Sequence, residues 1–596
     1  MEKSKNELKE SYLIERVFKK NYFVLLFGMM TMVICNIVDS AITGQFLGEK
    51  AVAAIGLIAP VVAIITVIIS IFSMGCGQLA SRYVGKADAA GVNRVFSTQM
   101  CTGAGISIVT FLVLLFFSEN IVQLLGKTAN HEIISFAADY LRGYSFGIVP
   151  LAVGLILNSL MTIDSDQKRC IIYVMIVLFT DIILDILNVT YFYAGMFGMS
   201  LATSISSFIG MIVMLLHFTK EGHILHFTIK NFDVGCLKEA FMIGISQSVN
   251  QLANTCFIFI LNNLLLYISG SRDLAAFAVA NVAFMIVYSI LGSLSSVTSI
   301  IMNLSYGEED KSSLRRILRI SIISGYRVGM ILLILLFVFA ENAAGIFIKN
   351  QDTAVLTQAV RFIRFIAVEN VFLIFSYSVL GSFMGTGHIS LNYLLGFLRD
   401  GVYPSVCTAI LGLLFGIQGL ETGFIAAGII TFVTCILIPC VRNKKFPRAI
   451  DDFLILSEDF DTKPEELLEV SINSATDISD ISEKVRQFCL MRGESKRNSM
   501  FLSLFVEEMA GNTFKHGSNE NKKIKTELRL LLKKGKRIIR LRDNGNRFDP
   551  VKWLEVNNPK DPEKGLGIRM IVGLAKEVKY ISSMELNTII INLEQD

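Results

Sequence analysis

Long apolar runs separated by short polar breaks fill roughly the first three-quarters of the 596-residue chain. A run of about 20 apolar residues suffices to cross a bilayer as a helix, and counting such runs predicts about twelve membrane-spanning helices. The expected spans lie near residues 22–46, 51–76, 95–117, 136–161, 171–193, 199–218, 240–268, 274–304, 318–340, 362–385, 392–415 and 419–441. The pattern ends at about Pro439, where charged residues become dense, so a soluble domain is expected to follow.

The periodicity of this last part, about 150 residues, is that of an α+β domain with one hydrophobic core. Strands are expected at Glu466–Asn473, Val578–Ser582 and Thr588–Leu593, helices at Ile478–Met491, Ser499–Lys515 and Gly565–Glu577, and a hairpin of Glu527–Leu532 with Arg537–Arg542 around Lys534 and Gly535.

Composition agrees with a membrane protein, since only 18% of the residues are charged against about 25% in soluble proteins. The net charge of +4 is too small to indicate nucleic acid as a partner. Lys and Arg gather in one set of breaks, for example at Arg82, Arg94 and Arg169, whereas the opposite breaks are nearly bare. The positive-inside rule therefore predicts a multi-pass protein of the cell (inner) membrane with both termini cytoplasmic. The ten cysteines form no C-x-x-C pair, so free thiols are expected.

An acid, Asp39, lies inside the apolar run Tyr22–Gly48. A carboxylate near the middle of a span costs on the order of 2.5–3.5 kcal/mol on insertion scales, so it indicates a transport or proton-relay site. Asn36 and Asp39 share one helix face, which we expect to look into the bundle or a water-filled cavity. The alternative is an acid near the helix end that snorkels to the interface.

The two halves of the membrane part repeat each other. Gly85 and Gly307 are separated by 222 positions (307 − 85), and the same offset relates Asp88 to Asp310 and Arg94 to Arg316. A repeat in one orientation predicts two lobes that face each other around an axis along the membrane normal.

These motifs resemble those of the MATE (multidrug and toxic compound extrusion) transporters. The resemblance rests on the run from Val38 to Gly56, on the Gly85 and Gly307 turns with their basic tails, and on Asp181-Ile-Ile-Leu-Asp185 in the fifth span. It implies a membrane all-α fold of twelve helices in two six-helix lobes, with a central drug cavity and proton- or sodium-driven antiport. By position, Asp39 and Asp185 inherit the cation-binding role of the first and fifth spans.

This chain also departs from the family pattern. Asp181 stands where the family usually has a neutral amide, and Gly244-Ile245-Ser246 replaces the proline common at the start of the seventh span. Asp39 has no acidic counterpart in the second half, where the repeat falls on Leu261. Coupling is therefore expected in one lobe, and the coupling ion, H⁺ or Na⁺, stays open.

Asp181 and Asp185 lie one turn apart on one face of an apolar span. Acids that share a low-dielectric cavity cannot all be ionised cheaply. A proton or a sodium ion among them relieves the repulsion and can be exchanged for a cationic drug. For Asp181 the alternative is a place at the headgroup level, near Lys168 and Arg169.

The seventh span carries a polar stripe at helical spacing. Amides in a membrane helix can line a substrate cavity or hold helices together, and we favour the cavity. The stripe consists of Gln247, Asn250, Gln251 and Asn254.

Three clusters in the soluble part indicate nucleotide chemistry. Glu508 and Asn512 lie one turn apart, and such a pair can hold a divalent metal and a water at a phosphate; the alternative is a solvated helix face. Asp543 follows a strand and precedes Gly545, so it can accept a hydrogen bond from an adenine amino group; the alternative is an ordinary turn. In Lys-Gly565-Leu-Gly567 a helix N-terminus can face phosphate.

Together the clusters resemble the GHKL ATP-binding fold, in particular the small serine kinases that act as anti-sigma factors. The resemblance implies ATP and Mg²⁺ as ligands, with Glu508 as general base, Asn512 as magnesium ligand and Asp543 as adenine contact. Gly545, Gly565 and Gly567 would be the hinges over the nucleotide. Asn546-Arg547 replaces the second glycine of the first glycine box. No phosphoacceptor histidine helix precedes the domain and no Walker A motif occurs, which disfavours a sensor histidine kinase and an ABC-type pump.

The expected organisation is a cytoplasmic N-terminal segment (1–20), an N-lobe (21–230), a C-lobe (231–445), a linker (446–460) and an ATP-binding domain (461–596). One hypothesis is a cation-coupled antiporter of small organic compounds that this domain regulates. The other is a membrane sensor whose tail signals as a serine/threonine kinase or anti-sigma-like switch to a cytoplasmic protein. The acids of the N-lobe favour the antiporter, because a sensor needs no ion-coupling group.

Overall fold

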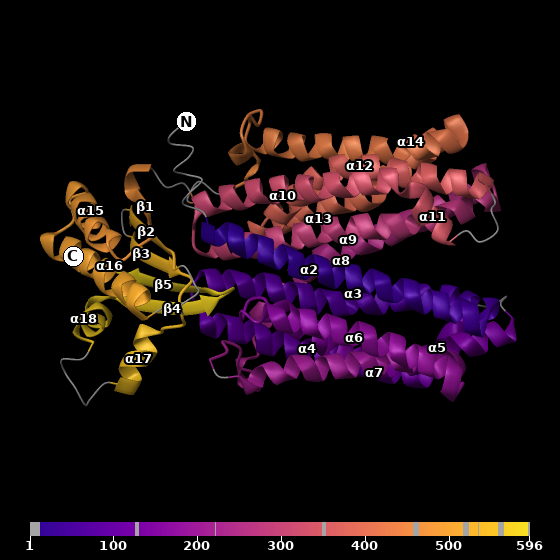
Figure 1. Ribbon diagram of the computed structural model, residues 1–596, viewed down its shortest axis with the longest axis horizontal. Coiled ribbons are helices and arrows are strands. Elements are labelled where there is room, and N and C mark those ends of the chain that lie inside the picture. The colour runs from indigo at the N-terminus through magenta and orange to yellow at the C-terminus, as the bar shows by residue number, and fades with distance from the viewer. Residues whose placement is uncertain are drawn as a thin grey trace.

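The computed structural model describes residues 12–125, 130–220, 222–347, 353–456, 460, 464–516, 524–533, 536–557 and 565–593. A long helical bundle carries a small sheet-and-helix domain at one end (Figure 1). The first helices of the bundle, here called the N-lobe, are α2 (Tyr12–Ile42), α3 (Glu49–Gly85), α4 (Ala89–Leu125), α5 (His131–Met161), α6 (Gln167–Leu187) and α7 (Gly195–Leu215). The C-lobe consists of α8 (Val234–Ile268), α9 (Ser271–Gly307), α10 (Lys311–Val338), α11 (Ala340–Phe347), α12 (Thr353–Gly385), α13 (Ile389–Phe397) and α14 (Tyr403–Arg442).

Within the described residues, 11 helices are long and apolar enough to cross a membrane. The last, Ile389–Arg442, is 54 residues long and is interrupted at Gly416, whose φ of 66° is left-handed. The chain reverses there. Gly419, after the interruption, packs against Leu411, before it, so closely that a Cβ on Gly419 would lie 1.9 Å from the carbonyl oxygen of Leu411. This segment therefore crosses twice, and the predicted fold class of twelve spans is confirmed.

The sequence repeat is also a repeat of the backbone. Helices α3 and α9 are both 37 residues long, and their first residues lie 222 positions apart (271 − 49). In the turns that follow, Ala87 and Glu309 both adopt a left-handed φ, of 50° and 54°. Asp88 and Asp310 then each accept a backbone N–H from the next helix. The two lobes are therefore built on the same plan.

Several helices begin before the apolar runs from which they were predicted. Helix α2 starts at Tyr12 rather than near 22, and α12 starts at Thr353 rather than near 362. Leu13, Val17 and Phe18 are buried in the first of these extensions. Apolar runs report only the part of a helix that lies in lipid, whereas packing extends it further.

The soluble domain is a five-stranded antiparallel sheet of order β1-β2-β3-β5-β4, covered on one face by helices (Figure 1). Its elements are β1 (Leu467–Ile472), α15 (Asp477–Met491), α16 (Lys496–His516), β2 (Thr526–Lys533), β3 (Lys536–Asp543), α17 (Pro550–Asn557), α18 (Leu566–Leu574), β4 (Glu577–Ser583) and β5 (Leu586–Asn592). Residues 534 and 535 of the predicted hairpin lie outside the described residues.

Two details of the sequence prediction are wrong. Helix α18 ends at Leu574, because Ala575 is already extended (φ −77°, ψ 143°), and Glu577 belongs to β4. Helix α17 follows the Asp543–Asp549 turn and was not expected.

The segment between the bundle and the soluble domain packs on the C-lobe. Leu454 and Ile455 are buried, and His388 Nε2 lies 2.7 Å from the carbonyl oxygen of Ile455. The chain therefore enters the soluble domain from a position tied to the bundle.

Candidate functional site

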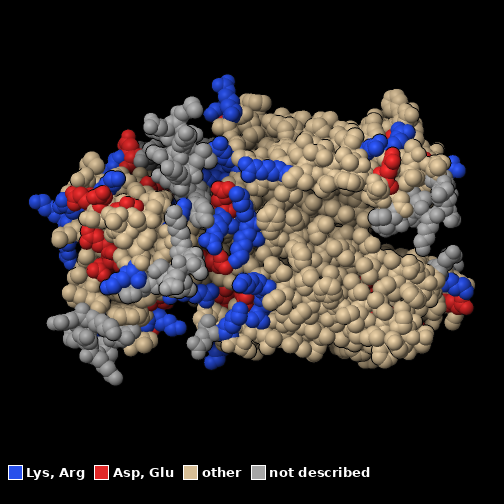
Figure 2. Space-filling model, in the orientation of Figure 1, with Lys and Arg blue, Asp and Glu red and all other residues tan. Residues whose placement is uncertain are grey.

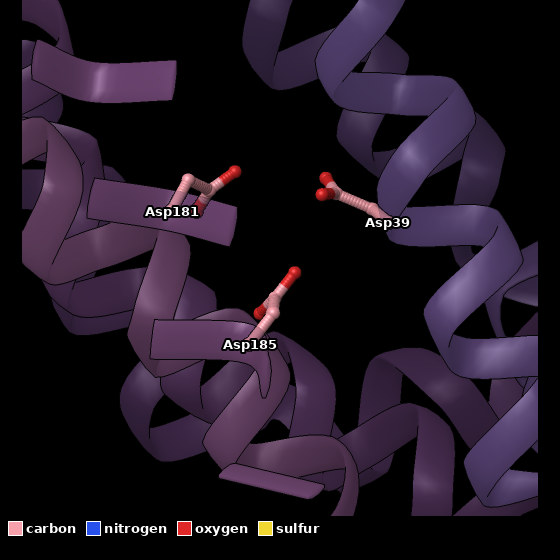
Figure 3. Close-up of side chains that lie close together, drawn as sticks. All are labelled: Asp39, Asp181 and Asp185. Atoms are coloured by element: carbon pink, nitrogen blue, oxygen red, sulfur yellow. The ribbon is translucent and has the colours of Figure 1, made fainter. Parts of the chain in front are cut away.

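Three aspartates from two helices meet inside the N-lobe. Asp39 comes from α2, and Asp181 and Asp185 come from α6, with one carboxylate oxygen of each within 4.8 Å of the others. Figure 3 shows the three carboxylates pointing toward a common centre. Asp181 and Asp185 are buried, at 3% and 1% exposure. Asn36, one turn before Asp39, is exposed.

Three of the six carboxylate oxygens in this aspartate group are buried without a hydrogen-bond donor among the described residues. Ser206 Oγ donates to Asp181 Oδ1 at 3.3 Å. Both oxygens of Asp185 and Oδ1 of Asp39 are buried without a donor among the described residues. Buried acceptors that face other acids require a proton or a bound cation. Three carboxylates at this short mutual distance can hold either a proton or a bound cation.

A cavity of about 280 Å³ lies next to the aspartate group, lined mostly by N-lobe helices and closed on one side by Ser296 and Ile300 of α9. Its wall is mostly apolar, with polar side chains at Gln78, Asn158 and Ser159. Cys35, one turn before Asp39, also lines it. The cavity therefore reaches to within one helical turn of the aspartates.

Three residues of the polar stripe of α8 do not line this cavity. Asn250 is buried against α13, where a Cβ built on Gly396 would lie 2.1 Å from the amide nitrogen of Asn250. Gln251 is exposed and Asn254 half-buried, and neither of them nor Asn250 lines the cavity. The side chain of Gln247 lies outside the described residues.

The C-lobe holds a buried charged cluster that the sequence reasoning missed. Arg399 and Asp400 form an ion pair of 2.6 Å, and the guanidinium lies 3.5 Å from the ring centroid of Tyr377. Glu369 is buried as well, at 5% exposure. The signal was two adjacent charges inside the span predicted at 392–415, and such a pair is retained only where it is compensated.

The lobes are closed against each other at the end that carries the soluble domain. A Cβ built on Gly85 would lie 2.0 Å from the carbonyl oxygen of Leu304, so α3 and α9 touch there through backbone. Arg82 donates to Glu239 and Asn303 across the same boundary, at 2.9 Å and 3.1 Å. Figure 2 shows a notch between the lobes at the opposite end of the bundle. The structure is thus closed on the domain side.

In the soluble domain, the predicted nucleotide residues gather between α16, the end of β3 and the start of α18. Asp543 Oδ1 accepts from Gly545 N at 2.7 Å and from Asn587 Nδ2 at 2.9 Å. Gly565 precedes α18 with a left-handed φ of 69°.

Helix α18 approaches the side chain of Glu508 on α16 closely at Gly567. A Cβ built on Gly567 would lie 2.1 Å from the carboxyl carbon of Glu508. Asn512 lies one turn after Glu508 on the same helix. A glycine backbone at a helix start, opposite a carboxylate and an amide, fits a phosphate chain with a divalent metal.

The bundle and its aspartate group define a class of protein. Two repeated lobes, with ionisable groups inside a span next to a cavity, are features of a secondary transporter.

A comparison with known protein families identifies the transporter family. The sequence matches the MatE family over residues 25–187 and 248–397, and the chain belongs to that family of MATE transporters. A second match, to the histidine kinase-like ATPase domain, covers residues 479–593. Both resemblances drawn from the sequence are confirmed.

Two relatives and two solved structures that resemble this chain have multidrug-transport or MATE names. The chain is 24% identical over 346 residues to the probable multidrug resistance protein YoeA of Bacillus subtilis (strain 168), covering 55% of this chain and 72% of that protein. It is 22% identical over 422 residues to the multidrug export protein MepA of Staphylococcus aureus (strain MSSA476), covering 70% and 91%. A crystal structure of MATE in complex with MaL6 superposes with a TM-score of 0.69 at 18% identity, covering 72% of this chain and 96% of that one. An outward-facing multidrug resistance MATE transporter of the MOP superfamily gives 0.68 at 18% identity, with the same coverage.

Proposed function

We propose that this protein is a cation-coupled antiporter that exports small organic, cationic compounds and is regulated by its ATP-binding domain. The observation that carries the proposal is the group of Asp39, Asp181 and Asp185, whose buried oxygens lack donors beside a cavity. The multidrug names of YoeA and MepA support drug-like substrates.

Exchange follows from competition for one set of charges. A proton or Na⁺ among the three carboxylates neutralises them, and a cationic solute in the adjacent cavity is then no longer attracted. When the cation leaves, the carboxylates attract the solute. One site thus alternates between two cations, as antiport requires.

The side of the membrane follows from the charges. Lys and Arg are concentrated where the bundle meets the soluble domain, and the middle of the bundle is nearly free of charge (Figure 2). By the positive-inside rule, the domain side is the cytoplasmic side, and both termini are cytoplasmic.

The soluble domain contains the proposed nucleotide-binding site. When bound there, Mg·ATP supplies a phosphoryl group and a divalent charge. Asp543 would accept from the adenine amino group and Asn512 would hold the metal. Glu508 would act as the base, with Gly545, Gly565 and Gly567 as the backbone around the nucleotide.

The test is substrate efflux from proteoliposomes under an imposed ΔpH or ΔNa⁺. Asp39→Asn is expected to abolish ion-driven efflux while the protein still inserts, because a neutral amide cannot exchange a cation. Asp139→Asn, at an acid that pairs with Arg142 outside the aspartate group, is the matched control and should transport normally. Normal gradient-driven efflux by Asp39→Asn would refute the antiport mechanism.

A further inference from the structure

The sheet face turned toward the bundle carries an arginine cluster that is buried against the C-lobe. Arg540 Nη1 lies 3.0 Å from Asp310 Oδ2 and also pairs with Glu308, and Arg542 pairs with Glu308 as well. Arg529 Nη2 donates to the carbonyl oxygen of Glu309 at 2.9 Å.

This C-lobe anchor is enclosed. The side chains of its arginines and of Glu308 and Asp310 are at most 7% exposed. Burial alone would raise the pKa of Asp310, but Arg529 and Arg540 hold that pKa well below its usual range. Removing one member would leave a buried charge without compensation, so the anchor resists separation.

The internal repeat explains why the anchor is on one lobe only. The α3–α4 turn reads Gly85-Lys86-Ala87-Asp88, and the α9–α10 turn reads Gly307-Glu308-Glu309-Asp310 on the same backbone. Lys86 stands where the C-lobe has Glu308. The C-lobe turn therefore offers three acids to the arginines, whereas the N-lobe turn, with Lys86 and Asp88, has no net charge to attract them.

The contact of the same domain with the N-lobe is of a different kind. The β4–β5 turn donates from Ser583 Oγ to the carbonyl oxygen of Ile163 at 2.7 Å and from Glu585 N to Ser165 Oγ at 2.9 Å. Lys20 pairs with Glu585 at 35% and 39% exposure. The N-lobe contact also buries Met584 within the apolar cluster of the bundle, and Arg547 lies 3.9 Å from Asp164 Oδ1. It has no enclosed network of several arginines and acids like that of the C-lobe anchor among the described residues.

The N-lobe contact includes the nucleotide loop. Arg547 donates to the carbonyl oxygens of Gly222 and Asp164, the latter at 3.2 Å. Arg547 stands in the glycine box that begins at Asp543. Asn587 Nδ2, which donates to Asp543, also donates to the carbonyl oxygens of Gly545 and Asn546. The loop conformation that presents Arg547 to the N-lobe is therefore held by bonds to the adenine-binding carboxylate.

We propose that the soluble domain is a clamp across the closed ends of both lobes, fixed to the C-lobe and released from the N-lobe by nucleotide binding. The inference rests on the proposed function, because alternating access needs the lobes to separate on the cytoplasmic side. An adenine amino group that takes an oxygen of Asp543 competes with Asn587 for it and loosens the loop that carries Arg547. Nucleotide binding and docking are thus linked, and each weakens the other.

The experiment uses the full-length protein in nanodiscs and a zero-length carbodiimide cross-linker. This reagent joins an amine to a carboxylate in contact, so it reports the Lys20–Glu585 pair by mass spectrometry. The exposed Lys50–Glu132 pair of the N-lobe, far from the soluble domain, is the internal control. Saturating Mg·ATP is expected to lower the Lys20–Glu585 yield several-fold and to leave the Lys50–Glu132 yield unchanged.

Two variants separate the parts of the inference. Arg547→Ala should lower the Lys20–Glu585 yield without nucleotide and raise nucleotide-free transport. Arg486→Ala, on α15 and paired with Glu483 of the same helix, should change neither. Glu308→Lys, which copies the N-lobe turn, should release the domain from the C-lobe and expose residues 446–456 to protease.

The outcomes are distinct. If calorimetry shows that the full-length chain binds no Mg·ATP, the nucleotide part of the proposed function and the clamp fail together. If Mg·ATP binds but the Lys20–Glu585 yield stays constant, the clamp alone is wrong. Equal behaviour of Arg547→Ala and Arg486→Ala would also overturn it.

Discussion

At the scale of single residues, the protein buries charged side chains in the C-lobe anchor and in the aspartate group. The two differ in whether a partner of opposite charge neutralises the buried charge. Arg540 and Asp310 neutralise each other at the clamp, so their role is to hold. The oxygens of Asp185 have no donor among the described residues, and the role proposed for them is to exchange a cation. Compensation thus separates the anchor from the transport site.

Asp543→Asn and Glu508→Ala should separate nucleotide binding from catalysis. An amide nitrogen at position 543 can face the adenine amino group where an acceptor is needed, and an unmatched donor costs about 1–3 kcal/mol. Nucleotide binding should therefore weaken in Asp543→Asn. Glu508→Ala should still bind Mg·ATP and lose any phosphoryl transfer, since a base acts on the nucleophile.

Calorimetric titration of both full-length variants with Mg·ATP checks this difference. Circular dichroism spectra that match the unsubstituted protein are the control for folding. Equal affinities in the two variants would contradict the role given to Asp543.

At the scale of elements, α3 and α9 set how closely the lobes approach. Their closest contact is backbone on backbone, with Gly85 against Leu304 and Gly307 against Arg82. Small residues at a helix crossing permit such approach in membranes, where packing rather than hydrophobicity drives association. The two glycines are equivalent in the repeat, so both lobes contribute the same device.

Gly85→Ala should destabilise the closed state. The added Cβ would lie 2.0 Å from a carbonyl oxygen, so the helices must shift, at about 1–3 kcal/mol. The melting temperature in detergent should fall. Gly56→Ala, on the same helix with nothing within 4 Å of its Cβ, is the matched control and should be neutral or slightly stabilising. Equal melting temperatures for the two variants would refute a tight crossing at Gly85.

At the scale of the whole molecule, the proposed transport site and the proposed regulatory domain lie in separable parts. The aspartate group and the cavity are complete within the bundle. In Figure 1 the soluble domain lies at one end of the bundle and contacts the bundle there. Its effect on transport is therefore expected to pass through the docking contacts.

A truncated chain of residues 1–456 should transport, and its rate should not respond to nucleotide. The end point retains Leu454 and Ile455, which are buried against the bundle. Gradient-driven efflux with and without Mg·ATP, compared with the full-length protein, measures both effects. A truncation that is folded and binds substrate yet never transports would show that the soluble domain is part of the transport machinery.

The sequence by itself determined the local features of this protein. Apolar run lengths predicted the spans, a constant offset predicted the repeat, and strand periodicity predicted the soluble fold. Each depends on residues close in the chain or on a regular spacing, which sequence reports directly. Helix α2 begins earlier than predicted because its first residues pack in the bundle, and α18 ends earlier because Ala575 is already extended.

Only the tertiary structure decided which faces meet. Asp39 lies 142 positions before Asp181 (181 − 39), and the fold of α2 against α6 brings them together. Arg529 lies between two leucines in β2, and Arg540 and Arg542 flank Leu541 in β3. Such alternation is typical of a sheet with one solvated face. Arg540 instead reaches Glu308, 232 positions away. Periodicity tells which side of an element is polar, but the partner of that side is set by how distant elements pack.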